Sequence, residues 1–169
     1  GMVVGDRIGP LNEKAPYIRE AYKVVEQKMG VKFGVNYIDK VLKDGVAIQT
    51  SIPASKLLVA FKSLNGNQSV LFAHELQNAL YYEGVHPDDM EGLLDSCNTF
   101  GVNKEEILSI AKSEQAVKAM NHDFVLSSKL GVTGFPTVFF LKGNNINVIA
   151  RGADSYDNVS NRLEELMKK

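Results

Sequence analysis

The chain has 169 residues, of which 44% are hydrophobic and 23% are charged, and its formal net charge is -1. These values are typical of one globular domain with a sizeable core, and the balanced charge argues against a nucleic-acid partner. No apolar run is long enough to span a bilayer, and the N-terminus has no signal-peptide pattern. We therefore expect no membrane association and a cytoplasmic location.

The first third of the chain predicts a strand followed by a helix. A short apolar start at residues 2–8 and the Gly9-Pro10 stop indicate a strand. In the next segment, apolar residues recur at spacings of four, three and four up to Met29, and Gly30 follows as a C-cap, so a helix is predicted. Residues 31–50 have a mixed pattern that indicates at most a short helix.

From Pro53 onward the pattern predicts a block of about five helices. Ser51 and Pro53 suit a cap and a first-turn proline, and an apolar stripe continues until Gly84. Three shorter helical runs follow, of which the second begins after Asn103 and the third after Ser113. Both residue types are favoured N-caps. The block should therefore end near residue 130.

The last part of the chain predicts a hairpin and a closing helix. The segments "PTVFFL" and "INVIARG" have strand composition, and the Gly143-Asn144 pair between them suits a tight turn. Residues 155–169 then form an amphipathic pattern. The predicted order is strand, helix, helical block, hairpin and helix.

Cys97 is the one cysteine of the sequence. A single cysteine excludes an intrachain disulfide and a Cys-rich metal site within these 169 residues. Its neighbours in a predicted helix include Leu93, Leu94 and Phe100. Such surroundings are typical of a buried, unreactive thiol.

The sequence predicts no metal site. Its three histidines are His74, His86 and His122. They lie far apart in the chain, and none pairs with a second ligand at the helical i, i+4 spacing. Phosphate-binding loops and nucleophile elbows are absent from the sequence as well.

The stretch "GVTGFPTVFF" places Pro136 at the first position of a predicted strand. A proline there fits a cis peptide in a tight turn, or a trans proline that merely opens the strand. In the cis case the N–H and C=O of Phe135 are exposed, and an extended peptide can pair with them. The pattern alone leaves both readings open.

This stretch, the hairpin behind it and the following "ARGADS" resemble the last third of the DsbA-like branch of the thioredoxin superfamily. The similarity is greatest to cytoplasmic bacterial proteins called predicted dithiol–disulfide isomerases. The helical block resembles the helical insertion of this branch, which "SIPASKLLVAFK" would enter, and "MVVGDRIGP" resembles the second strand of its core.

The resemblance implies an α/β thioredoxin-like fold with an all-helical insertion domain. Residues 2–52 would form the first part of the core and residues 53–130 the insertion. Residues 131–169 would form the cis-proline loop, the hairpin and the C-terminal helix of the core.

The resemblance also implies thiol–disulfide oxidoreductase or isomerase activity on a peptide or protein thiol. The substrate-binding residues carried over are Gly134, Phe135, Pro136 and Thr137. The first strand and the Cys-x-x-Cys of the family should precede Met2 and are missing from this sequence. We therefore expect no catalytic residue in the chain as given, and disulfide exchange by it that is absent or very weak.

Two explanations for the missing elements stay open. Either the native protein has the Cys-x-x-Cys upstream, or the domain has lost it and acts as a non-catalytic peptide-binding module. In both cases an unpaired strand edge favours a homodimer that completes the sheet.

A further alternative is a glutathione-dependent transferase or isomerase of the same fold. Asp154 and Ser155 in "GADS" are similar to the pattern with which kappa-class relatives hold the γ-glutamyl amine of glutathione. The competing interpretation is that these residues cap the last helix, where a carboxylate and a hydroxyl meet free N–H groups. Glutathione is therefore the one cofactor that the sequence suggests, and only on this alternative.

Overall fold

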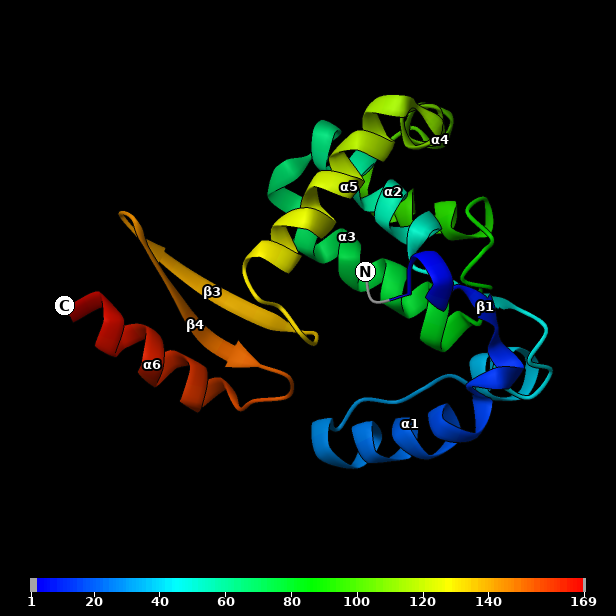
Figure 1. Cartoon of the computed structure of the whole chain (residues 1–169). Coiled ribbons are helices and arrows are strands. Elements are labelled where there is room, and N and C mark those ends of the chain that lie inside the picture. Colours follow the sequence, from blue (N-terminus) through cyan, green and yellow to red (C-terminus); the bar gives the residue numbers. More distant parts are fainter. Residues whose placement is uncertain (1–2, 169) are drawn as a thin grey trace. The chain divides into compact units, whose positions relative to one another are not determined.

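The structure is a computed structural model and describes residues 3–168, except for the side chain of Ala15. Residues 3–124 form one compact unit, here called the helical unit, and the remaining residues from 125 form a second, here called the hairpin unit (Figure 1). None of the helices in the described part of the chain is long and apolar enough to cross a membrane.

The helical unit contains short 3-10 and π-helices between its α-helices. In chain order its elements are η1 (Gly5–Arg7), β1 (Gly9–Pro10), η2 (Leu11–Glu13), α1 (Ala15–Met29), η3 (Tyr37–Leu42), β2 (Ile48–Gln49), α2 (Ile52–Leu64), η4 (Gly66–Gln68), α3 (Ser69–Asn78), η5 (Ala79–Glu83), η6 (Gly92–Phe100), α4 (Lys104–Lys112) and the larger part of α5 (Glu114–Lys129). Elements η3 and η5 are π-helices. The two short strands pair antiparallel, with Gly9 opposite Gln49.

The ends of three helices follow from local capping. Gly30 ends α1 in the left-handed conformation (φ 69°), and its N–H donates to the carbonyl of Glu26. The side chain of Asn103 accepts hydrogen bonds from two N–H groups in the first turn of α4. Ser113 accepts one from Ala116 at the start of α5. These predicted caps are confirmed.

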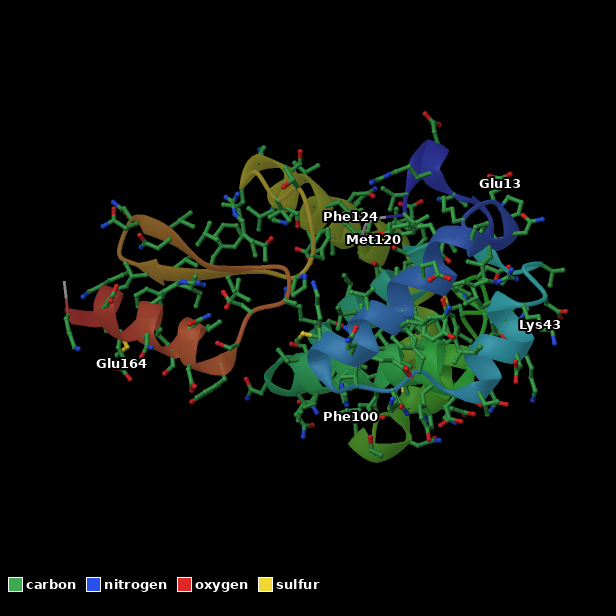
Figure 2. All side chains as sticks on the ribbon, turned by 90° about the horizontal axis from the view of Figure 1, so that it is seen from below. Glu13, Lys43, Phe100, Met120, Phe124 and Glu164 are labelled. Atoms are coloured by element: carbon green, nitrogen blue, oxygen red, sulfur yellow. The ribbon has the colours of Figure 1, made fainter. Side chains whose placement is uncertain are left out.

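Two separate cores hold the helical unit together. In the larger one the rings of Phe61 and Phe72 stack at 4.1 Å between centroids, and Phe100 meets both edge-on. The smaller core gathers Leu11 and Leu42 with neighbours from η3. Side chains fill the interior between the helices (Figure 2). Burial of such side chains stabilises by about 1.5–3 kcal/mol each.

The strand predicted at residues 2–8 is wrong for the described residues 3–8. The chain there forms the 3-10 helix η1, and Gly5 adopts a positive φ of 57°. The apolar run before Gly5 is short, and Gly-Asp favours a turn over a strand. Among the residues that the structure describes, Val3 hydrogen-bonds only to Ser51, through its N–H and its C=O. Met2 lies outside the described residues.

Three other local expectations differ in detail. Ser51 stands at the N-cap of α2 but makes no capping bond, because its hydroxyl accepts from the Val3 N–H. The long helix predicted up to Gly84 changes to the π-helix η5 at Ala79. The helix predicted around Cys97 is the 3-10 helix η6.

The hairpin unit consists of β3 (Thr137–Lys142), β4 (Asn145–Arg151) and α6 (Tyr156–Lys168), preceded by the end of α5. The strands pair antiparallel through the turn at Gly143-Asn144, as predicted, with an irregularity between Val138 and Phe139. Helix α6 packs against β4 (Figure 1), where Arg162 donates to the carbonyl of Ile149 at 2.7 Å.

Candidate functional site

The four predicted substrate-binding residues form one turn directly before β3. The Phe135–Pro136 peptide bond is cis. Two hydrogen bonds hold the turn: the hydroxyl of Thr137 donates to the carbonyl of Gly134 at 2.8 Å, and the N–H of Gly152 donates to the carbonyl of Pro136 at 2.7 Å. The turn is therefore tied to both strands of the hairpin.

Phe135 is exposed in this turn, as is Pro136. The side chain of Phe135 is 47% exposed. Within residues 3–168, neither its N–H nor its C=O takes part in a hydrogen bond. A main-chain donor and acceptor that are both free beside a strand can pair with an extended peptide.

The second predicted group, Asp154 and Ser155, lies in the same unit as this turn. The hydrogen bond from Gly152 to Pro136 joins the segment after β4 to the turn before β3. The two candidate groups are 17 or more residues apart in the sequence, and the strand pairing of Thr137 with Arg151 brings their segments together.

The carboxylate of Asp154 is heavily hydrogen-bonded. Its Oδ1 accepts from the N–H of Ser155 and from Nδ2 of Asn158, both at 2.9 Å. Its Oδ2 accepts from Nη1 of Arg162. The hydrogen bonds from Asn158 and Arg162 hold the pKa of Asp154 below its ordinary value, so this group is a carboxylate at neutral pH.

Ser155 caps α6. Its hydroxyl accepts from the N–H of Asn158 at 3.2 Å, and its carbonyl accepts from the N–H of Val159. The hydrogen bonds of Asp154 and Ser155 thus stabilise the N-terminus of α6. A role for Asp154 and Ser155 in holding a ligand stays a prediction.

Cys97 is fully buried within η6, as predicted. Burial raises the pKa of its thiol; nearby Lys104 lowers it and Asp95 raises it, both by less. A protonated thiol without access to solvent is a poor nucleophile.

One feature of the helical unit had no signal in the sequence. Tyr37, Ser55 and Tyr81 line a cavity of about 200 Å³ together with the segment that leads into α2. Its walls come from η3, α2 and η5, which are separate elements of the chain. No motif or spacing connects these residues, so only the folded arrangement reveals them.

Solved structures with the same fold come from two bacteria. A proposed protein disulfide isomerase from Nitrosomonas europaea has a TM-score of 0.82 at 17% identity, over 95% of this chain and 77% of its own. The cytosolic disulfide reductase DsbM from Pseudomonas aeruginosa has a TM-score of 0.76 at 23% identity, over 95% of this chain and 79% of its own. The structure of the same reductase with GSH has a TM-score of 0.73 at 22% identity, and the match covers 95% of this chain and 80% of that chain. A search of curated proteins found no significant match.

These likenesses concern the fold, a thioredoxin fold that is mostly helical with a few short strands. A match to the sequence model of a family adds to them. The model of the DSBA-like thioredoxin domain matches residues 3–164, which include the turn at Phe135, the hairpin, most of α6 and all the α-helices before them. Because this match covers nearly the whole sequence, the chain belongs to the family of DSBA-like thioredoxin domains.

Proposed function

We propose that this protein takes part in thiol–disulfide exchange as a DsbA-family oxidoreductase or isomerase, and that the turn at Phe135 holds a peptide of the substrate. The observation that carries the proposal is the free N–H and C=O of a half-exposed Phe135 beside β3. Family membership supports it, as do a disulfide reductase and a proposed isomerase among the structural neighbours. The described location of that reductase supports a cytoplasmic site of action.

The exchange itself needs a thiolate that attacks a disulfide sulfur. Cys97 does not fit this role, because it is fully buried and burial raises its pKa. We therefore propose that these 169 residues bind the substrate and do not exchange disulfides alone. Insulin reduction with dithiothreitol should be no faster with the chain than without it. A clear rate that persists in Cys97→Ser would contradict this division of roles.

Peptide binding at Phe135 can be tested through the main chain of the ligand. In a series of extended peptides, N-methylation of the one residue that pairs with Phe135 should weaken binding roughly tenfold, as expected for one lost hydrogen bond. N-methylation of the next residue should have little effect, because neighbouring residues of a strand point their N–H groups to opposite edges. Equal effects at both positions would exclude strand pairing.

The ring of Phe135 gives an independent test. Phe135→Ala should weaken the binding of the same peptides, because a half-exposed aromatic side chain offers apolar contact area. Tyr156→Ala is a matched control, since Tyr156 is an exposed aromatic residue of the same unit. A peptide that binds at Phe135 with no thiol chemistry, in a protein shown to lack the cysteine pair, would support the binding-module alternative.

Glutathione is the second candidate ligand. Asp154 favours it, because an ionised carboxylate lies in the segment that Gly152 joins to the turn. A structural neighbour that was solved with GSH also supports it. Glutathione affinity should fall in Asp154→Ala and persist in Asp157→Ala, because Asp157 is an exposed acidic residue in the first turn of α6. An equal fall in both variants would mean that only the start of α6 was disturbed.

We also propose that two copies of the chain pair through a strand edge. Among the described strands, β3 and β4 pair only with each other, so each leaves one edge unpaired within the hairpin unit. Such edges favour association. A clean monomer by light scattering at micromolar concentration would contradict the dimer.

A further inference from the structure

The cavity beside Tyr37 is lined wholly by residues of the helical unit. Its volume is about 200 Å³. Drug-sized ligands occupy cavities of about 300–1,000 Å³, so this one suits a smaller molecule or a single chemical group.

Tyr37 lines this cavity, and its hydroxyl has no hydrogen-bond partner within residues 3–168. The residue is only 4% exposed, and its ring packs in the smaller core with Leu11 and Leu42. In that part of the chain, every side-chain nitrogen or oxygen that is sealed from solvent has a hydrogen-bond partner, so the hydroxyl of Tyr37 is not sealed from solvent. Because Tyr37 lines the cavity, we infer that its hydroxyl opens into it. A buried donor in this situation gains from a ligand that accepts its hydrogen bond.

The N-terminus of α2 faces the same space. This helix has 13 residues; Ser51 makes no capping bond, and the hydroxyl of Thr50 accepts from the N–H of Ile52 at 3.1 Å. Pro53 has no N–H, and the N–H of Ala54 makes no hydrogen bond within the described part of the chain. Ala54 lines the cavity. Its N–H and the positive end of the helix dipole together favour a negative charge there.

The remaining lining is neutral and rich in donors. Hydroxyls of Ser55 and Tyr81 and the amide of Gln49 belong to it, and none of its residues is acidic or basic. The rings of Tyr37 and Tyr81 meet edge-on at 5.4 Å between centroids. Burial, and to a smaller extent Tyr81, raises the pKa of Tyr37 to about 12, so its hydroxyl is a neutral donor at pH 7.

We propose that this cavity binds the carboxylate group of a small ligand, which accepts hydrogen bonds from the hydroxyl of Tyr37 and the N–H of Ala54. A carboxylate offers several acceptor positions and no donor, which matches a lining of donors without a competing negative charge. The carboxylate can belong to a free organic acid or to the C-terminus of a peptide. The proposal does not depend on disulfide exchange.

The test is titration of the ¹⁵N-labelled full chain with sodium acetate and propanoate, with acetamide as the neutral isostere. The amide resonances of Ala54 and Ser55 should shift and saturate with the acids and not with acetamide. Tyr37→Phe keeps the ring and removes the hydroxyl, and should weaken binding about tenfold or more, because hydrogen bonds to charged groups are strong. Tyr82→Phe is the matched control, since Tyr82 lies outside this cavity, and should bind as the wild type does.

Two further arms separate the sources and guard against misfolding. If the carboxylate comes from the C-terminus of a peptide, a tripeptide with a free C-terminus should compete with acetate, and the same tripeptide with a C-terminal amide should not. If neither tripeptide competes, the site is assigned to free organic acids. If Tyr37→Phe fails to fold, Ser55→Ala replaces it and should weaken binding several-fold. The proposal is overturned if the acids cause no saturable shift, if acetamide or inorganic phosphate binds as well as acetate, or if the folded variants bind unchanged.

Discussion

The two units of this chain differ most in how much of their apolar surface they bury. The helical unit has two cores, and in one of them Phe61 and Phe72 are fully enclosed. In the described hairpin unit from residue 125 on, the buried hydrophobic residues are Ile149 and Ala150, and α6 buries none of its side chains. Stability and recognition are therefore divided, because the turn proposed to bind substrate lies on the unit with the smaller core.

The exposed apolar residues of the hairpin unit agree with this division. Phe135, Leu141 and Ile146 are all exposed. Single exposed apolar residues are ordinary, but several on one hairpin are typical of a surface that contacts another molecule or segment. Four changes test how sharply the two units differ, beginning with the largest effect.

Phe61→Ala should lower the free energy of unfolding by about 3–5 kcal/mol, because it leaves a cavity beside Phe72 and Phe100. Denaturation with urea measures this change. Val70→Ala on α3 is the control, since Val70 is 80% exposed, and it should cost less than about 0.5 kcal/mol. A cost below about 1 kcal/mol for Phe61→Ala would show that the larger core does not stabilise the unit.

Gly34→Ala should destabilise the helical unit by about 2–3 kcal/mol. A Cβ at Gly34 would overlap the main chain of Tyr82, and Gly34 already donates its N–H to the carbonyl of Tyr81. Thermal unfolding followed by circular dichroism measures the loss. Gly66→Ala is the matched control, because a Cβ there meets no atom within 4 Å, and its unfolding should stay close to that of the wild type.

Ile149→Ala should lower the free energy of unfolding by about 2 kcal/mol. This loss is at the low end for a buried isoleucine, because the core of the hairpin unit is small. Ile146→Ala on the same strand is the control: Ile149 is 6% exposed and Ile146 is 52% exposed. The two variants are compared by chemical denaturation. Equal losses of unfolding free energy in the two variants would contradict the difference in burial between Ile149 and Ile146, since Ile146 would then be covered by something outside the hairpin unit.

The smallest effect concerns pH. The pKa of Asp154 is lowered in the folded protein by hydrogen bonds from Asn158 and Arg162. A lowered pKa contributes stability above the unfolded value near 4, and this contribution is lost as the pH falls through the folded value. The wild type should therefore melt at a higher temperature than Asp154→Asn at neutral pH, and this difference should shrink as the pH drops below about 4. A gap between the two that widens on acidification would contradict the assignment.

Most elements with local signals could be predicted from the sequence. Gly30, Asn103 and Ser113 end or begin helices through bonds within a few residues, and the Gly143-Asn144 pair turns the hairpin between adjacent strands. Residues 3–8 were mispredicted because the turn at Gly5 outweighs a short apolar run. Ser51 was mispredicted as a cap because a distant partner, Val3, takes its hydroxyl.

The candidate site divides in the same way. The sequence indicated the turn from Gly134 to Thr137, because a proline before a strand is a local signal. It left open whether Asp154 caps a helix or holds a ligand, since the contact with Arg162 depends on how α6 begins. It had no signal for the cavity at Tyr37, whose walls come from three separate segments.

The helical block, the hairpin with its closing helix, the burial of Cys97 and the family resemblance could thus be derived from the chain alone. These features depend on short-range periodicity, caps and turn residues, which the sequence displays directly. Only the tertiary structure decided that Phe135 keeps free main-chain groups, that the carboxylate of Asp154 is engaged, and that Tyr37 and the start of α2 line one cavity. Each of these depends on which distant groups satisfy one another's hydrogen bonds, and such pairing is settled only when the chain is packed.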